Sequence, residues 1–413
     1  MNWLVFIAAL LVLVLIDFYV FQGIKVLLRK WPAFWRRAAY ISFWGATLYI
    51  LTTFFFYKVL GPQRMSPYLQ RWSTTFFFIL YVAKLPALLL LIFDDLIRVA
   101  KWAVIKLAQP KKTYVGQKIS RSQFLVKASV VAAAIPATAL GFGILSGAYD
   151  YRVRRKRIPV ANLPRAFHGL RIGQISDIHS GSFFNKTAVE GGVDLLLAEK
   201  PDLFVFTGDL VNNETSEVKD YKPIFARARA PLGAFSTLGN HDYGDYHRWP
   251  SAAAKQKNMD DLVQVHREMG WDLLRNENRL LEIDGEKLAI IGVENWGAGR
   301  FSKHGDIARA YRGSEEAAAK VLLSHDPSHW DAQIRPGYKD IDLMLAGHTH
   351  GFQFGVEIGN FRWSPSQYMY KQWADLYTEG NQHLYVNRGY GFIGYPGRVG
   401  ILPEVTILEL VRA

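Results

Sequence analysis

The sequence predicts two parts of different fold class, an all-α bundle of about four transmembrane helices followed by an α/β domain. Long apolar runs, four in all, lie within residues 1–148. After residue 163, short strands rich in β-branched and aromatic residues alternate with helical segments, a pattern typical of α/β domains. Several of these strands end in a polar cluster, which marks one edge of the predicted sheet as the candidate functional site.

The expected spans cover about residues 3–21, 38–60, 73–93 and 124–148. Each is long enough to cross a hydrocarbon core of about 30 Å at about 1.5 Å per residue. The first contains Asp17 but no small-residue cleavage site, so we expect a retained helix and no removable signal peptide. The third contains Lys84, which either lines the bundle or contacts a lipid head group. We therefore expect a transmembrane region over 1–148, a linker over 149–164 and the α/β domain over 165–413.

The positive net charge belongs to the N-terminal part alone. Residues 1–157 hold 22 Lys and Arg against four acidic residues, whereas residues 158–413 hold 27 against 32. Because the cations flank apolar runs and form no stripe on the α/β part, we expect no nucleic-acid partner. The chain has no cysteine, which excludes disulfides, thiol catalysis and cysteine-ligated zinc.

The loop charges predict the orientation in the cell membrane. The loop after the first span has five Lys and Arg, the second has two, and the region from Arg98 to Arg121 has seven. The positive-inside rule then places the first and third loops in the cytoplasm and the α/β domain on the extracytoplasmic side. The basic run from Arg152 to Arg157 argues for the opposite orientation.

Five polar clusters follow apolar strands in the second part. The expected strands cover 170–176, 203–207, 234–238, 288–293, 321–323 and 343–346, and the expected helices cover 186–199 and 259–269. The side chains of interest are Asp177, His179, Asp209, Asn240, His325, His348 and His350. Strand alternation would place Asp177 and His179 on one side of their strand. Because ligands bind at the carboxyl ends of strands in open α/β sheets, all seven side chains can converge on one crevice.

These seven donors fit two first-row metal ions, such as manganese, iron or zinc, bridged by a shared carboxylate. Two ions about 3.5 to 4 Å apart would clamp a phosphoryl group and lower the pKa of a bridging water. Each cluster has an ordinary alternative, since Asp209 could cap a helix, Asn240 could occupy a turn and His325 could be a packed core histidine. The pair His348 and His350 follows a strand and a glycine. Two histidines at this spacing cost stability unless a ligand such as a metal ion binds them.

The motifs Asp-x-His, Gly-Asp, Gly-Asn-His-Asp, Ser-His and Gly-His-x-His, in this order, resemble the signature blocks of the calcineurin-like metallophosphoesterases, and within that family the membrane-anchored bacterial branch. The resemblance covers about residues 165–413. It implies a four-layer αββα sandwich, a two-layer β-sandwich flanked by helices. It also implies ligands for one metal (Asp177, His179, His350), ligands for the other (Asn240, His325, His348) and a bridging Asp209. His241 matches the histidine that stabilises the phosphoryl oxygens or protonates the leaving group.

Other residues keep two interpretations. We expect Asp242 to orient its neighbours, and Arg388 either to pair within the structure or to contact a substrate phosphate. The segments 363–377 and 294–304 form either an apolar lip towards the bilayer or ordinary packing.

The combined prediction is a membrane-bound dinuclear phosphoesterase that hydrolyses phosphomonoesters or phosphodiesters with a metal-activated hydroxide. Its partners would be the lipid bilayer and a phosphoester substrate, which could be a phospholipid or a lipid-linked nucleotide. One alternative is a tethered general or nucleotide phosphoesterase, and another is a non-catalytic regulatory module on a transport-like bundle.

Overall fold

The computed structural model describes residues 2–61, 64–108, 122–359 and 361–413. The chain divides into two units, residues 1–141 and 142–413. Part of the third loop, residues 109–121, on which the orientation count partly depends, lies outside the described residues.

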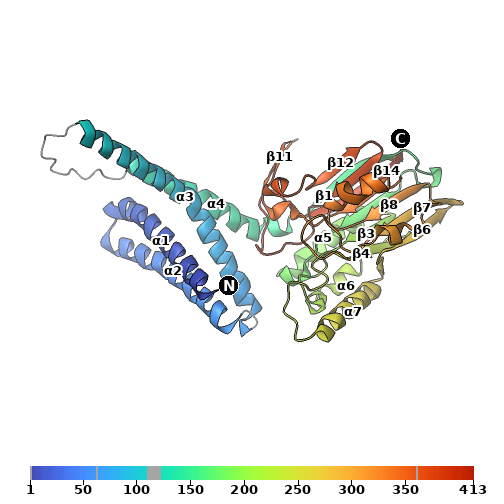
Figure 1. The fold of residues 1–413 in the computed structure, drawn as a ribbon, viewed down its shortest axis with the longest axis horizontal. Helices are drawn as coiled ribbons and strands as arrows, with labels where there is room; N and C mark the ends of the chain where they lie inside the picture. The colour runs from blue at the N-terminus through green and yellow to red at the C-terminus, as the bar shows by residue number, and fades with distance from the viewer. Residues whose placement is uncertain (1, 62–63, 109–121, 360) are drawn as a thin grey trace. The chain divides into compact units, whose positions relative to one another are not determined.

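Helices build the first unit, and four of them are long and apolar enough to cross a membrane. They are α1 (Trp3–Leu27), α2 (Ala33–Leu60), α3 (Pro67–Ala108) and α4 (Gln123–Leu145) (Figure 1). The unit boundary falls within α4, so its residues 142–145 belong to the second unit. Many of their large apolar side chains are exposed, as expected for a surface that contacts lipid. Four long apolar helices thus cover the four expected spans, and α3 extends beyond residues 73–93 at both ends.

A buried polar cluster joins the first three helices. The Asp17 carboxylate of α1 accepts hydrogen bonds from Thr47 Oγ1 of α2 at 2.6 Å and from Tyr81 OH of α3 at 2.8 Å. Lys84 Nζ lies 2.5 Å from Asp17 Oδ1, and both side chains are buried. Lys84 therefore lines the bundle and pairs with an acid there, which satisfies two charges that would be costly in hydrocarbon.

The second unit is an α/β domain with two mixed six-stranded sheets. The first sheet has the order β1-β14-β2-β3-β4-β5 and the second has the order β12-β13-β9-β8-β7-β6. The first comprises β1 (Arg152–Val160), β2 (Arg171–Ile175), β3 (Leu203–Thr207), β4 (Ala234–Thr237), β5 (Asp272–Leu273) and β14 (Glu404–Arg412). The second comprises β6 (Glu277–Ile283), β7 (Glu286–Gly292), β8 (Ala319–Leu323), β9 (Leu343–Ala346), β12 (Asp375–Glu379) and β13 (Gln382–Val386). A small hairpin, β10 (Val356–Ile358) and β11 (Phe361–Trp363), lies outside both sheets.

Hydrophobic patterning explains the layers. Alternate residues of β3 point to opposite faces, so Leu203 and Val205 join the core between the sheets while Phe204 and Phe206 join an outer core. That outer core includes residues of α5 (Lys186–Ala198), α6 (Lys222–Phe225) and α7 (Ala252–Met269). Residues of α8 (Ile307–Tyr311) and of the turn Trp330–Ile334 cover the outer face of the second sheet. The four layers of the expected αββα sandwich are therefore present.

Residues 149–164, expected as a linker, contain β1, which pairs in parallel with β14. Its basic residues are matched by acids of the domain, because Arg155 pairs with Glu199, Lys156 with Asp375 and Arg157 with Glu409. Hydropathy patterns do not predict this strand because it is rich in cations, and the acids that neutralise them lie far away in the sequence.

Candidate metal centre

The predicted ligands converge because both sheets end at one place. Strands β2, β3 and β4 are parallel, as are β7, β8 and β9, so each group delivers its carboxyl ends to a single edge. The ligands follow β2 (Asp177, His179), β3 (Asp209), β4 (Asn240), β8 (His325) and β9 (His348, His350). All seven are buried or nearly buried.

Two clusters of metal-ligating atoms result. In the first, His350 Nε2 lies 3.3 Å from Asp177 Oδ1 and 3.0 Å from His179 Nε2. In the second, which comprises Asp209, His325 and His348, His325 Nε2 lies 3.1 Å from Asp209 Oδ2 and 3.2 Å from His348 Nδ1. Asp209 Oδ2 also lies 3.5 Å from His179 Nε2, so this one carboxylate is within reach of both clusters.

The backbone reaches this arrangement through turns and not through strand alternation. Strand β2 ends at Ile175, and Asp177 and His179 both have positive φ angles, of 53° and 49°. Asp209, His348 and His350 have positive φ as well. Left-handed backbone at residues other than glycine stores strain and is concentrated at functional sites. The side chains of Asp177 and His179 do converge, as expected. The structure corrects the reason, because a turn with left-handed backbone brings them together and not the alternation of a strand.

The chemistry of the donor set fits divalent cations. Two pairs of imidazole nitrogens lie close together, at 3.0 Å between His179 and His350 and at 3.2 Å between His325 and His348. Such a pair can donate both of its lone pairs to one cation. Asn240 donates from Nδ2 to Tyr246 OH, while its buried Oδ1 has no hydrogen-bond partner among the described residues. A buried amide oxygen without a hydrogen-bond partner is suited to coordinate a metal ion.

The pKa shifts show the charge balance of the two clusters. Burial lowers the pKa of His179 to about 3 and that of His348 to about 4, so both rings are neutral at pH 7, as metal ligation requires. Burial opposes the charge on His325, but the carboxylates of Asp209 and Asp177 outweigh it and raise the pKa of His325 to about 10. The second cluster thus favours a positive charge beside Asp209.

Neighbouring groups fix the ligands in place. The Asp242 carboxylate accepts the backbone N–H groups of Asp209, Leu210 and Gly239 at 2.8–2.9 Å, which holds the two loops that carry Asp209 and Asn240 together. His325 Nδ1 donates to the carbonyl oxygen of Thr207 at 2.7 Å.

Sequence patterns did not single out three further partners of the ligands. Asn212 Oδ1 lies 3.1 Å from His179 Nδ1, Tyr370 OH lies 2.7 Å from His348 Nε2, and Arg398 Nη2 lies 3.1 Å from His350 Nδ1. Asn212 follows the Gly-Asp motif closely and could have been suspected from that position. Tyr370 and Arg398 come from distant loops, and their neighbourhood carries no recognisable motif.

His241 lies at the rim of the clusters with a defined orientation. Its Nδ1 donates to the carbonyl oxygen of Asn212 at 2.9 Å, which leaves Nε2 for another partner. Its backbone N–H donates to Asp209 Oδ1 at 2.9 Å, and its ring packs edge-on against that of His179.

A cavity of about 310 Å³ opens over the clusters. His179, Asp209, Asn240, His241, His348 and His350 form one part of its wall. The apolar part includes Phe301, Phe352, Met369 and Ile393, with the rings of Tyr370 and Tyr395. The two segments expected as an apolar lip each contribute to this wall.

Arg388 lies away from the cavity wall and is fully buried. Its guanidinium pairs with Glu404 at 2.7 Å and with Glu357 at 2.7 Å. Of the two interpretations of Arg388, the geometry supports structural pairing.

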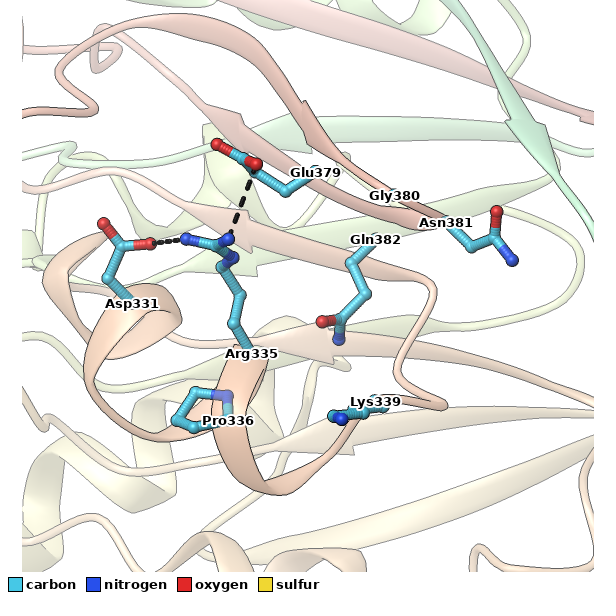
Figure 2. Close-up of a pocket in the computed structure, with 8 residues that line it drawn as sticks. All are labelled: Asp331, Arg335, Pro336, Lys339, Glu379, Gly380, Asn381 and Gln382. Carbon is cyan, nitrogen blue, oxygen red and sulfur yellow. Dashed lines mark hydrogen bonds and ion pairs between the residues drawn. The ribbon is translucent and has the colours of Figure 1, made fainter.

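Another hollow, beside β12 and β13, has a different character. Figure 2 shows Arg335 between Asp331 and Glu379, to which its guanidinium pairs at 2.8 and 3.4 Å. The residues that line this hollow include no histidine, so it does not repeat the chemistry of the two clusters.

Comparisons with known proteins agree with the geometry. Residues 170–352 match a family model described as calcineurin-like phosphoesterase, and residues 1–148 match one described as probable calcineurin-like phosphoesterase, transmembrane domain. The chain is 29% identical over 307 residues to the uncharacterized metallophosphoesterase YkuE of Bacillus subtilis, which covers 71% of the chain and 98% of the relative. It is 28% identical over 316 residues to a transmembrane protein with metallophosphoesterase domain of Danio rerio, covering 72% of the chain and 68% of that protein. It is 27% identical over 278 residues to the UDP-2,3-diacylglucosamine pyrophosphatase LpxG of Chlamydia trachomatis, covering 56% of the chain and 81% of the relative.

Proposed function

Since the chain belongs to the calcineurin-like metallophosphoesterases that carry an N-terminal transmembrane domain, we propose that it hydrolyses the phosphoester bond of a membrane lipid or lipid-linked nucleotide. The observation that carries this proposal is the divided cavity wall, with metal ligands on one part and Phe301, Phe352, Met369 and Ile393 on another. A phosphate group bound at the clusters would thus lie beside a surface suited to an apolar substituent.

Two divalent ions, of manganese, iron or zinc, would supply a nucleophile from water at neutral pH and neutralise charge on the phosphoryl oxygens. We assign Asp177, His179 and His350 to one ion, Asn240, His325 and His348 to the other, and Asp209 to both. The unpartnered Oδ1 of Asn240 supports its inclusion, and the position of Asp209 between the clusters supports the bridge.

His241 is the catalytic residue that we assign to the leaving group or to the phosphoryl oxygens. Because its Nδ1 is engaged by a carbonyl oxygen, its Nε2 is the atom that can donate a proton to substrate. Asp242 acts through the backbone and positions the Asp209 loop.

A tethered phosphoesterase for soluble substrates is the second candidate, since the same clusters would serve any phosphoester. The apolar wall favours the lipid substrate. The Chlamydia trachomatis relative is named a UDP-2,3-diacylglucosamine pyrophosphatase, and the acylated nucleotide-sugar in that name also favours a lipid-linked substrate here. A non-catalytic regulatory role is disfavoured by two complete ligand clusters.

We propose that the catalytic domain faces the extracytoplasmic side. The basic run 152–157 argued for the cytoplasm, but its side chains pair with acids within a folded sheet, which weakens that objection. Reporter fusions after residue 150, with periplasmic and cytoplasmic reporters compared, would test the orientation, and activity of the cytoplasmic reporter alone would reject it.

A substrate comparison tests the function itself. Full-length protein purified with manganese would be assayed in mixed micelles against lipid phosphoesters and, in parallel, against nitrophenyl phosphate esters and nucleotides. We expect a higher kcat/KM for at least one lipid substrate, and no turnover of any substrate by the Asp209→Ala variant. Hydrolysis of the soluble esters alone would reject the lipid proposal and leave the tethered enzyme.

A further inference from the structure

Strand β10 and the residues before it have an inverted pattern of exposure. Alternate apolar residues are exposed, namely Phe352, Phe354, Val356 and Ile358, and Ile358 reaches 73%. Of the intervening residues, Gln353 and Gly355 are buried and Glu357 is half-buried. A strand at the surface of a soluble domain normally has the opposite alternation, with its apolar side chains towards the core.

Polar bonds hold this inverted strand in register. Gln353 donates to the carbonyl oxygens of Tyr395 and Gly397, and its Oε1 accepts the N–H of Ile393 at 2.7 Å. Glu357 pairs with Arg388 and with Arg154. These bonds hold the polar side chains of the segment on its inner side, which leaves its apolar side chains on the outer face.

The exposed surface continues onto the neighbouring turn. Phe361 of β11 is 61% exposed, and Tyr368 and Met369 are 76% and 68% exposed. Ser364 Oγ donates to the carbonyl oxygen of Gly351, which fastens this turn to the loop that carries His350. We call these side chains, Phe354, Val356, Ile358, Phe361, Tyr368 and Met369, the hairpin face.

The last residues of α4 pack against the base of the same hairpin. The backbone N–H of Arg398 donates to the carbonyl oxygen of Gly143 at 3.1 Å, and Gly355 N–H donates to the carbonyl oxygen of Val399 at 2.9 Å. A Cβ at Gly147 would lie 2.0 Å from the carbonyl oxygen of Arg398, so only glycine permits this packing. One loop, residues 395–399, therefore joins the end of a candidate transmembrane helix to the hairpin.

We propose that the hairpin face inserts into the interfacial region of the lipid bilayer, in the leaflet where α4 ends. Because backbone hydrogen bonds join this loop to Gly143 and to Gly355, the hairpin lies near the last turn of α4, the end of an apolar helix. The exposed Ile, Val and Phe side chains suit the acyl boundary, and Tyr368, with Trp363 Nε1 hydrogen-bonded to its hydroxyl, suits the head-group level where Trp and Tyr are enriched.

The hairpin face reaches the cavity, since Met369 belongs to both. Phe352, in the turn that precedes β10, also lies in the cavity wall. If the substrate is a lipid, as proposed above, its acyl chains could approach the metal centre along this surface. The membrane contact does not depend on that substrate, because it concerns the catalytic domain in any catalytic state.

The absence of cysteine permits a direct test. Full-length single-cysteine variants Ile358→Cys, Phe361→Cys and Tyr368→Cys would be labelled with the environment-sensitive dye NBD and placed in phosphatidylcholine nanodiscs. Glu282→Cys is the matched control, because Glu282 is an exposed strand residue in β6. Figure 1 shows β6 at the end of the α/β domain opposite to the hairpin.

We expect a blue-shifted emission at positions 358 and 361, with loss of fluorescence when doxyl-labelled phosphatidylcholine is included, and neither effect at position 282. If the variants at positions 358 and 361 fail to fold, the emission at position 368, which lies outside the hairpin strands, still tests the proposal. Emission at all three positions equal to that at 282 would overturn the proposal. So would protection that appears only in nanodiscs holding two copies of the chain, because the occupant would then be a second copy. The readout needs no turnover, so failure of the lipid-substrate proposal would leave its result unaffected.

Discussion

Replacement of His241 by alanine separates metal binding from proton transfer. The backbone N–H of His241, which the substitution retains, is the group that bonds Asp209, so both metal clusters should keep their geometry. The side chain contributes its ring to the cavity wall, where it packs edge-on against His179, and its Nδ1 is bonded to the carbonyl oxygen of Asn212. We expect His241→Ala to bind two metal ions as the wild type does and to lose rate alone.

The size of the loss depends on the leaving group. General acid catalysis contributes about 10²- to 10⁴-fold, which corresponds to about 2.7 to 5.4 kcal/mol at about 1.36 kcal/mol per factor of ten. An alkyl alkoxide needs a proton as it departs, whereas p-nitrophenolate does not. If His241 protonates the leaving group, alkyl esters should therefore lose the full factor and p-nitrophenyl esters much less.

The assay is kcat for a series of aryl and alkyl phosphate esters, measured on full-length protein whose metal content is determined by mass spectrometry. His247→Ala is the matched control, because His247 lies six residues further on and pairs with Glu214 outside the cavity wall. An equal loss for all esters would assign His241 to the phosphoryl oxygens instead. Loss of metal, or an unchanged rate with every ester, would refute the assignment altogether.

Four further substitutions, one of them a comparison variant, test the site and its support. Asp209→Ala should leave at most one metal ion bound and abolish turnover, because this carboxylate is within reach of both clusters, and metal analysis of the purified variant would measure the loss. Arg388→Gln should lower the free energy of unfolding by about 3–5 kcal/mol, because it leaves buried carboxylates without their cation. Arg335→Gln removes a partly exposed ion pair and should lower it by only about 0–1 kcal/mol. Chemical denaturation would measure both values, and equal losses would contradict the reasoning. Gly347→Ala should weaken the first metal site without unfolding the domain, because its Cβ would lie 2.1 Å from Asp177 Oδ2; unchanged metal content would refute the steric reasoning.

The sequence predicted those parts of the fold that depend on local patterns. The strand at 203–207 agrees with β3 at both ends, since a run of large apolar residues between polar turns has few other interpretations. Helix α7 begins at Ala252, before the expected Met259. Ser251 caps a first turn made largely of alanine, and the residues from Lys255 to Asn258 are polar, so this part of the helix has no stripe of large apolar residues.

Local patterns could not predict elements that are stabilised by residues far away in the sequence. Strand β1 consists largely of cations that find their acids across the tertiary structure, and the short hairpin of β10 and β11 is inverted because its apolar face points away from the core. The candidate ligands were identifiable because each follows a strand in a short motif. Tyr370 and Arg398 touch the ligands from loops whose course no local pattern predicts.

The position of β14 also constrains the order in which the protein can form during synthesis. This strand lies between β1 and β2, and it hydrogen-bonds to both. The first three strands of the sheet therefore cannot assemble while Glu404–Arg412 remains in the ribosome, although the membrane helices have by then left it. Until β14 emerges, β1 and β2 would expose unpaired edges beside the membrane, a state prone to mispairing. Chaperone protection of this late intermediate would be most needed in the interval between insertion of α4 and emergence of β14.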